Sequence, residues 1–236
     1  MSKSIKSKLF DITAKADATR KYQWAVDIFE RYNKEYNFDL NLKYKLGLLY
    51  DHLAIIKSSK IKNQRRREMF MRKYLGKAES IYREILKEEK NNLLAFRGLA
   101  RVYEAQGKYR EAIQHALRSY RIMSKLPKNK RGPLGIGSFY ESVGDKKKAE
   151  EWYKKELTLL GKNDIGANAN LMNFYRRIDK FENALPYAEK SERLLLKIFS
   201  IHSSSDRTEL MKQNQTIRFL FNSIDEVKSR IRSRAR

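Results

Sequence analysis

The sequence contains no cysteine, and this absence excludes several kinds of chemistry. A chain without thiols has no disulfide framework, no thiolate metal site and no cysteine nucleophile. Only three prolines interrupt the 236 residues, so long helices are favoured. No apolar run approaches the ~20 residues that a membrane-spanning helix needs, and the basic amino terminus lacks the apolar core of a signal peptide. We therefore expect a helical cytoplasmic protein without a membrane span.

Motifs for catalysis are also missing. The three histidines, His52, His115 and His202, lie far apart, and none belongs to an HExxH pattern. The serine nucleophile pattern GxSxG is absent. The glycine-rich segment at 132–137 lacks the Lys-Ser/Thr of a phosphate loop, so we interpret it as a linker leading into a close helix crossing. We expect no enzyme activity, no catalytic residue, no metal site and no cofactor.

Positive charge is abundant instead. The chain has 52 Lys and Arg against 28 Asp and Glu, a formal net charge of +24. An excess of this size favours acidic partners, which include nucleic acid, ribosomes, an acidic protein segment or an anionic membrane surface. Half of the excess is local, since residues 51–77 carry nine basic and two acidic residues and residues 228–236 carry five basic residues and no acid. Charge alone does not choose among these partners.

An internal repeat runs through the middle of the chain. Segments that start at Phe96, Pro133 and Asn168 superpose, and the shared feature is a Tyr followed nine residues later by an Ala. Apolar residues recur at three and four positions on both sides of a short polar turn, which indicates two helices per unit. A lone helical hairpin cannot bury both of its faces, so neighbouring units must stack. The Tyr and Ala pairs are Tyr103 and Ala112, Tyr140 and Ala149, and Tyr175 and Ala184.

These residues resemble the tetratricopeptide repeat family, whose signature places an aromatic residue, a Leu-Gly or Leu-Ala pair and a Tyr on the first helix. Phe96, Leu99, Ala100 and Tyr103 match that signature best. The resemblance implies an all-α fold, a right-handed α-solenoid of about five antiparallel helix hairpins, with a C-terminal capping helix from Asp206 to about residue 231. We predict a repeat domain over residues 1–200, with a basic insertion at 51–77 that lengthens the second hairpin, and a capping helix with a basic tail over residues 201–236.

The resemblance also implies a function, that of a non-catalytic scaffold or adaptor whose first helices line a concave groove for a peptide or protein segment. Arg and Asn side chains suit an acidic peptide, because they offer carboxylate and backbone hydrogen bonds. The alternative is that Arg97 and Arg101 form an ordinary solvated face paired with acids such as Glu104. The groove positions carried over from the family pattern are Arg97, Arg101, Ser138, Asn170, Asn173 and Arg176.

A second hypothesis is binding to RNA or to ribosomes through the basic insertion and the tail. Phe70 and Tyr74 lie near basic residues and could stack on bases, although their helical spacing favours a place in the core. We expect the tail to fray in solvent unless a partner orders it. A homo-oligomer also stays open, because an incompletely covered end repeat could stack on a second copy. The residues assigned to this hypothesis are Lys60, Lys62, Arg65, Arg66, Arg67, Arg230, Arg232 and Arg234.

Overall fold

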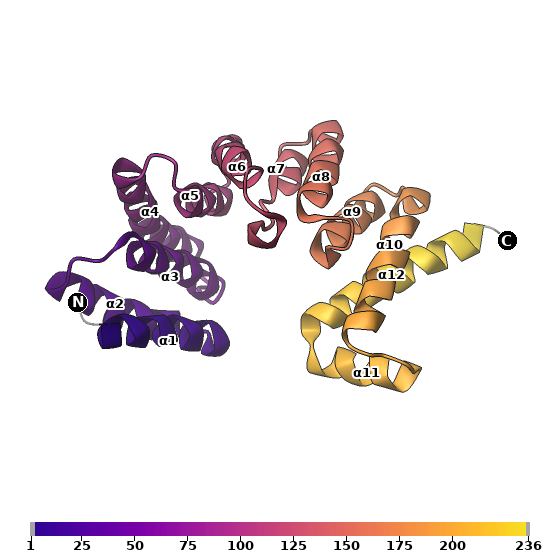
Figure 1. The fold of residues 1–236 in the computed structure, drawn as a ribbon, viewed down its shortest axis with the longest axis horizontal. Coiled ribbons are helices and arrows are strands. Elements are labelled where there is room, and N and C mark those ends of the chain that lie inside the picture. Colours follow the sequence, from indigo (N-terminus) through magenta and orange to yellow (C-terminus); the bar gives the residue numbers. More distant parts are fainter. Residues whose placement is uncertain (1–2, 235–236) are drawn as a thin grey trace. The chain divides into compact units, whose positions relative to one another are not determined.

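The computed structural model describes residues 3–234, and within them it contains α-helices, one 3₁₀ turn and no β-strand (Figure 1). The all-α, helical-repeat fold class predicted from the sequence is confirmed. None of the helices in residues 3–234 is both long and apolar enough to cross a membrane. The elements are α1 (Lys3–Thr19), α2 (Tyr22–Glu35), α3 (Leu40–Ser58), α4 (Gln64–Glu88), α5 (Leu93–Ala105), α6 (Tyr109–Met123), η1 (Lys128–Lys130), α7 (Ile136–Ser142), α8 (Lys146–Leu160), α9 (Ile165–Arg177), α10 (Phe181–Ile198), α11 (Ser204–Gln213) and α12 (Gln215–Arg234).

The chain divides into two compact units, Met1–Lys125 and Leu126–Arg236. In the first unit the hairpins are α1–α2, α3–α4 and α5–α6, and in the second they are α7–α8 and α9–α10. Helix α12 packs against α10 and α9, so residues after 200 are part of the second unit. The helices α3 and α4 have 19 and 25 residues, against 13 and 15 for α5 and α6, which makes this the longest hairpin of the first unit.

Four of the hairpins turn through one residue in the left-handed backbone region. These residues are Arg20, Gly107, Gly144 and Asp179, with φ of 56°, 72°, 83° and 56°. Glycine adopts this conformation without the steric cost that a Cβ atom adds, about 1–2 kcal/mol for a residue such as arginine. Gly107, Gly144 and Asp179 therefore lie in the short polar turns predicted between the two helices of each repeat unit. Arg20 is unusual among the four, because Gly, Asn and Asp are the residues that adopt this conformation routinely.

Close helix crossings depend on glycines that face an aromatic ring. A Cβ atom on Gly137 would lie 2.6 Å from the ring of Tyr153, as the close crossing predicted there requires. The same arrangement occurs twice around Tyr82, where a Cβ atom would lie 2.7 Å from the ring at Gly47 and 2.4 Å at Gly98. Tyr82 is fully buried. The absence of a side chain at these glycines lets adjacent helices pack at short range.

Three tyrosines, Tyr50 of α3, Tyr103 of α5 and Tyr175 of α9, each tie their hairpin to the one before it. Each hydroxyl donates a hydrogen bond to a glutamate on the second helix of the preceding hairpin, and each glutamate also accepts from a Lys or Arg. These three tyrosines therefore lie between neighbouring hairpins. The three sets are Tyr50, Glu30 and Lys77 (2.6 and 2.6 Å), Tyr103, Glu79 and Arg83 (2.8 and 2.9 Å), and Tyr175, Glu150 and Lys154 (2.8 and 2.5 Å).

The C-terminal segment corrects one prediction. A single helix from Asp206 to about residue 231 is wrong, because the backbone of Asn214 is extended and its side chain accepts from the N–H groups of Thr216 and Ile217 at 3.1 Å. An Asn in this position starts a new helix. The first of the two helices also begins earlier than Asp206, with Ser203 as its N-cap and Asp206 as the partner in a capping box. Helix α12 buries one apolar face, through Ile217, Phe221, Ile224 and Val227.

Candidate binding surfaces

Two of the six predicted groove residues lie on one helix of the first unit. Arg97 and Arg101 are one turn apart on α5, and both are half-buried. The Arg101 guanidinium lies 2.5 Å from the carboxylate of Asp51 on α3, and 35% of the Arg101 side chain is exposed while Asp51 is fully buried. A guanidinium has five N–H donors, so this ion pair leaves donors available to a ligand. We call Arg97 and Arg101 the α5 arginine pair.

Asp51 is a residue that the sequence reasoning missed. Burial raises its pKa, and the positive charges of Arg101 and His52 oppose that rise. Burial also lowers the pKa of His52, whose Nδ1 lies 3.4 Å from Asp17. A buried carboxylate is stable in the ionised form only when a cation lies close, so Asp51 holds Arg101 in one orientation. The signal in the sequence is a single acid between apolar neighbours such as Tyr50 and Leu53.

The other four groove candidates belong to the second unit. The Ser138 hydroxyl donates to the Gly135 carbonyl at 2.8 Å, so it serves the turn before α7. On α9, Asn170 is exposed, Asn173 is half-buried, and Arg176 forms an ion pair with Glu226 of α12. The structure therefore brings Asn170, Asn173 and Arg176 onto one helix, but Arg176 is already paired. A single groove containing all six residues stays a prediction.

The basic insertion presents its charges at the turn between α3 and α4. Lys60, Lys62, Arg65 and Arg66 are exposed there. Arg67 has a different role, because its Nε and Nη2 atoms donate to the Ile61 carbonyl at 3.0 and 2.9 Å. That guanidinium closes the turn although Arg67 is itself exposed, and the other four predicted cations of this region face solvent.

The basic tail is helical as far as Arg234, so the expectation that it frays is wrong for the residues that the structure describes. The guanidinium groups of Arg230 and Arg234 lie 5.9 and 5.4 Å from the centroid of the Phe181 ring on α10. Arg234 also pairs with Glu182 at 3.0 Å. Arginine stacks on aromatic faces and buries its aliphatic stem, which stabilises the last turns of α12. Arg236 lies outside the described residues.

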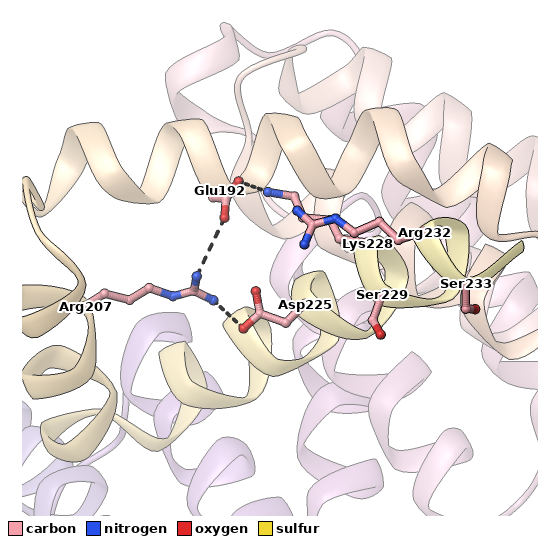
Figure 2. A pocket seen from close by; sticks show the side chains of 7 residues that line it. All are labelled: Glu192, Arg207, Asp225, Lys228, Ser229, Arg232 and Ser233. Carbon is pink, nitrogen blue, oxygen red and sulfur yellow. Dashed lines mark hydrogen bonds and ion pairs between the residues drawn. The ribbon is translucent and has the colours of Figure 1, made fainter. Parts of the chain in front are cut away.

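Arg232 lines a cleft of about 700 Å³ formed by α10, α11 and α12 (Figure 2). Figure 2 shows Arg207 between two acids, with ion pairs of 3.8 Å to Glu192 and 2.6 Å to Asp225. Glu192 also pairs with Lys228. Both acids of this cleft are thus paired with Arg207 or Lys228, and the ion pairs of Arg207 tie α11 to α10 and α12.

The glycine-rich segment at 132–137 surrounds a carboxylate of the same chain. Glu156 of α8 is 2% exposed, and its Oε1 accepts from the Ile136 N–H at 2.8 Å, at the start of α7. Burial raises the pKa of Glu156 to about 7, against the opposing effect of hydrogen bonds from the amides of residues 134–137. The amides that could hold a phosphate thus have an internal partner, which agrees with the linker interpretation. Residues 3–234 contain no group of three His, Asp or Glu side chains that could hold a metal ion.

Known proteins share this fold. A family model described as "Tetratricopeptide repeat" matches residues 95–130, and no curated protein matches the sequence. The thermophilic TPR protein TTC0263 of Thermus thermophilus is 17% identical, with a TM-score of 0.61 over 92% of this chain and 97% of its own. MamA, for which a crystal structure is known, is 16% identical in sequence, with a TM-score of 0.54. That match covers 78% of this chain and 95% of the MamA chain. A MamA RS-1 double mutant is 14% identical in sequence, with a TM-score of 0.53, and the match covers 81% of this chain and 94% of the mutant chain.

At these identities the structural likeness concerns the fold. The signature residues themselves are in the matched segment, which contains Phe96, Leu99, Tyr103 and Ala112. Their packing follows the pattern, with Leu99 and Ala112 fully buried and the Tyr103 hydroxyl bonded to the preceding hairpin. Residues 95–130 therefore match the tetratricopeptide repeat model in sequence and in packing, and the chain has the fold of tetratricopeptide repeat proteins of known structure.

Proposed function

We propose that this protein is a non-catalytic scaffold or adaptor that binds an acidic peptide or protein segment, with the α5 arginine pair as its anchor. The observation that supports this most is the ion pair between Arg101 and the buried Asp51. A guanidinium held by a buried acid loses less conformational freedom on binding than a free arginine does. The remaining donors of Arg101 can then meet a carboxylate of the partner.

The charge balance on α5 determines how strongly the α5 arginine pair attracts an acidic partner. Asp51 offsets the charge of Arg101, so attraction to an acid depends on the hydrogen bonds of Arg101 and on the charge of Arg97. Partly exposed pairs of this kind contribute about 0.2–1 kcal/mol each, and charge reversal adds repulsion. We expect reversal of the pair to weaken capture of an acidic partner about tenfold or more, which corresponds to about 1.4 kcal/mol.

The first experiment is affinity capture with the double variant Arg97→Glu and Arg101→Glu, after nuclease treatment of the lysate. The control is Arg65→Glu with Arg66→Glu, which makes the same charge change on exposed positions of α4. Loss of a partner in the first variant and its retention in the second supports the proposal. The reverse result would remove it.

Arg101→Glu places a second acid against buried Asp51, so this variant can fail by misfolding. A second variant avoids that problem, because Arg101→Gln together with Asp51→Asn removes both charges of the pair. Combined with Arg97→Glu, it should keep the thermal midpoint of the wild type within a few degrees and still lose the partner. If this folded variant captures the partner as well as the wild type does, the α5 arginine pair is not the anchor.

A second candidate function is association with RNA or ribosomes, supported by the four exposed cations at the α3–α4 turn. A protein held by phosphate contacts loses affinity steeply as salt rises, because bound cations are released from the nucleic acid. Binding of a generic RNA should therefore survive at physiological salt, fall with added salt, and weaken in the variant Arg65→Glu with Arg66→Glu. A flat salt response, or no binding, would eliminate this function.

A further inference from the structure

A separate surface of the first unit is a cleft between the start of α2 and the end of α3. Its volume is about 400 Å³. The residues come from the α1–α2 turn, the first turn of α2, the last turns of α3 and the segment after it. We call it the α2–α3 cleft, and it is lined by Arg20, Lys21, Tyr22, Gln23, Trp24, Leu53, Ile56, Lys57 and Lys60.

The charged side chains of this cleft are all positive. Arg20, Lys21, Lys57 and Lys60 line it, all four are exposed, and no Asp or Glu is among the lining residues. The ion pairs found between residues 3 and 234 include none of these four cations. Four cations without a counter-charge attract an anionic ligand.

The acids near the cleft in sequence have other partners, and Asp51, two residues before Leu53, pairs with Arg101. Asp17 lies 3.4 Å from His52 and hydrogen-bonds the Tyr22 side chain. Asp27 accepts a hydrogen bond from Gln23 at 2.8 Å. Within residues 3–234, neither acid forms an ion pair with a cation of the cleft.

The rest of the lining is apolar. Trp24 is 38% exposed and Ile56 is half-buried, while Leu53 and Tyr22 are buried. An exposed tryptophan is uncommon on the surface of a soluble protein and is enriched where proteins bind one another. The α2–α3 cleft thus combines an apolar surface with cations around it.

The backbone at Arg20 is a further independent observation. Its φ of 56° is the conformation that Gly107 and Gly144 adopt in the corresponding turns. Arginine there costs about 1–2 kcal/mol relative to a residue without a Cβ atom. Strained backbone residues cluster at functional sites, where the side chain is needed. In the first hairpin this strained position supplies one of the four cations of the cleft.

We propose that the α2–α3 cleft binds an acidic segment of a protein partner, in which a bulky apolar side chain is flanked by Asp or Glu. The apolar side chain contacts Trp24 and Ile56, and the flanking carboxylates pair with the surrounding cations. This site is separate from the α5 arginine pair and does not depend on it.

A nucleic acid fits this cleft less well. Stacking of a base needs a free aromatic face, and the Nζ atom of Lys15 already lies 5.6 Å from the centroid of the Trp24 ring. Reading a base edge needs polar partners. The one amide side chain of the cleft, Gln23, donates to Asp27 and accepts from Lys57 at 3.2 Å. The side chain of Leu53 has no polar atom, so it cannot form a hydrogen bond with the edge of a base.

Trp24 provides a local reporter for the test. The chain has two tryptophans, so the variant Trp152→Phe leaves Trp24 as the source of indole emission. The full-length variant is titrated with the synthetic peptide DEDLFDED, which contains no tryptophan. We expect a saturable change in Trp24 emission. The peptides NQNLFNQN and DEDAADED should each bind about tenfold more weakly, because the first lacks the charges and the second lacks the bulky apolar side chains.

Two variants test the cations of the cleft, and the first has a matched control. Lys21→Gln should weaken peptide binding about threefold or more, and Lys108→Gln should not. Lys108 occupies the same position at the start of α6, with φ −89° and ψ 67° against φ −88° and ψ 54° for Lys21. Arg20→Gly should weaken binding similarly while keeping or raising the thermal midpoint, because glycine favours this backbone conformation.

Three outcomes would overturn the proposal. The first is no response of Trp24 emission to the acidic peptide. The second is equal loss of binding in Lys21→Gln and Lys108→Gln, which would show that overall charge alone attracts the peptide. The third is tighter binding of a single-stranded oligouridylate than of the peptide, with the same dependence on Arg20 and Lys21, which would assign the cleft to nucleic acid.

Discussion

Glu156 is the buried acid whose titration the structure predicts most sharply. Its Oε1 accepts at 2.8 Å from the amide of Ile136, which follows Gly135 with its φ of 72°. Two effects compete, because burial favours the neutral carboxyl while the amides of residues 134–137 favour the carboxylate. Burial is the larger effect and raises the pKa to about 7. The perturbation is Glu156→Gln, which keeps an acceptor for Ile136 and cannot titrate.

The sign and size of the pH dependence follow from that pKa. In the unfolded chain the carboxyl has its ordinary pKa of 4.5, so between pH 4.5 and about 7 the folded state binds the proton more tightly. The contribution of Glu156 to stability is complete below pH 4.5 and is lost as the pH rises through about 7. A difference of about 2.5 pH units, at about 1.36 kcal/mol each, amounts to about 3 kcal/mol.

The assay is urea denaturation followed by circular dichroism, from pH 4.5 to 8, for the wild type and Glu156→Gln. The free energy of unfolding of the wild type should fall relative to the variant by up to about 3 kcal/mol over this range. Glu151→Gln is the control, because Glu151 is an exposed glutamate of the same helix. A flat difference would refute the reasoning. A wild type that gains stability with rising pH would show that the amides outweigh burial.

Three other substitutions test the packing between helices, each by urea denaturation. Gly98→Ala places a Cβ atom 2.4 Å from the buried Tyr82 ring and should lower the free energy of unfolding by about 1–3 kcal/mol; an unchanged value would contradict the close crossing. Tyr82→Phe removes a buried hydroxyl that has no hydrogen-bond partner in residues 3–234, so stability should stay equal or rise. Tyr175→Phe removes the 2.8 Å hydrogen bond to Glu150 and should cost about 1 kcal/mol, and no loss would mean that this bond does not stabilise the hairpins.

Local patterns in the sequence predict most of the fold. The spacing of Tyr103 and Ala112 indicates a helical hairpin because both residues face the neighbouring helix, and the structure confirms that both are buried. Turns at Gly107 and Gly144 are predictable because glycine adopts a left-handed backbone conformation easily. Such features depend on residues close in sequence, which a pattern can reveal.

Contacts between distant residues are the part that the sequence did not reveal. Asp51 and Arg101 are 50 residues apart, and their ion pair depends on how α3 packs on α5. The hydrogen bond from the Ile136 amide at the start of α7 to Glu156 of α8 likewise depends on how these two helices pack. The break at Asn214 was missed because apolar residues continue at helical spacing through it, and only the side-chain cap marks the new helix.

The distribution of the acidic residues explains why the positive charge is exposed. Glu30, Glu79 and Glu150 accept hydrogen bonds from tyrosines between hairpins, and Asp51 is buried under Arg101. Carboxylates that are bonded between helices offset less of the positive charge of Lys and Arg side chains elsewhere on the surface. Salt screens exposed charges beyond about 8–10 Å, so attraction acts through local groups of cations rather than through the net charge of +24. Binding at the α2–α3 cleft should therefore retain its apolar part at high salt, whereas binding through phosphate contacts alone should not.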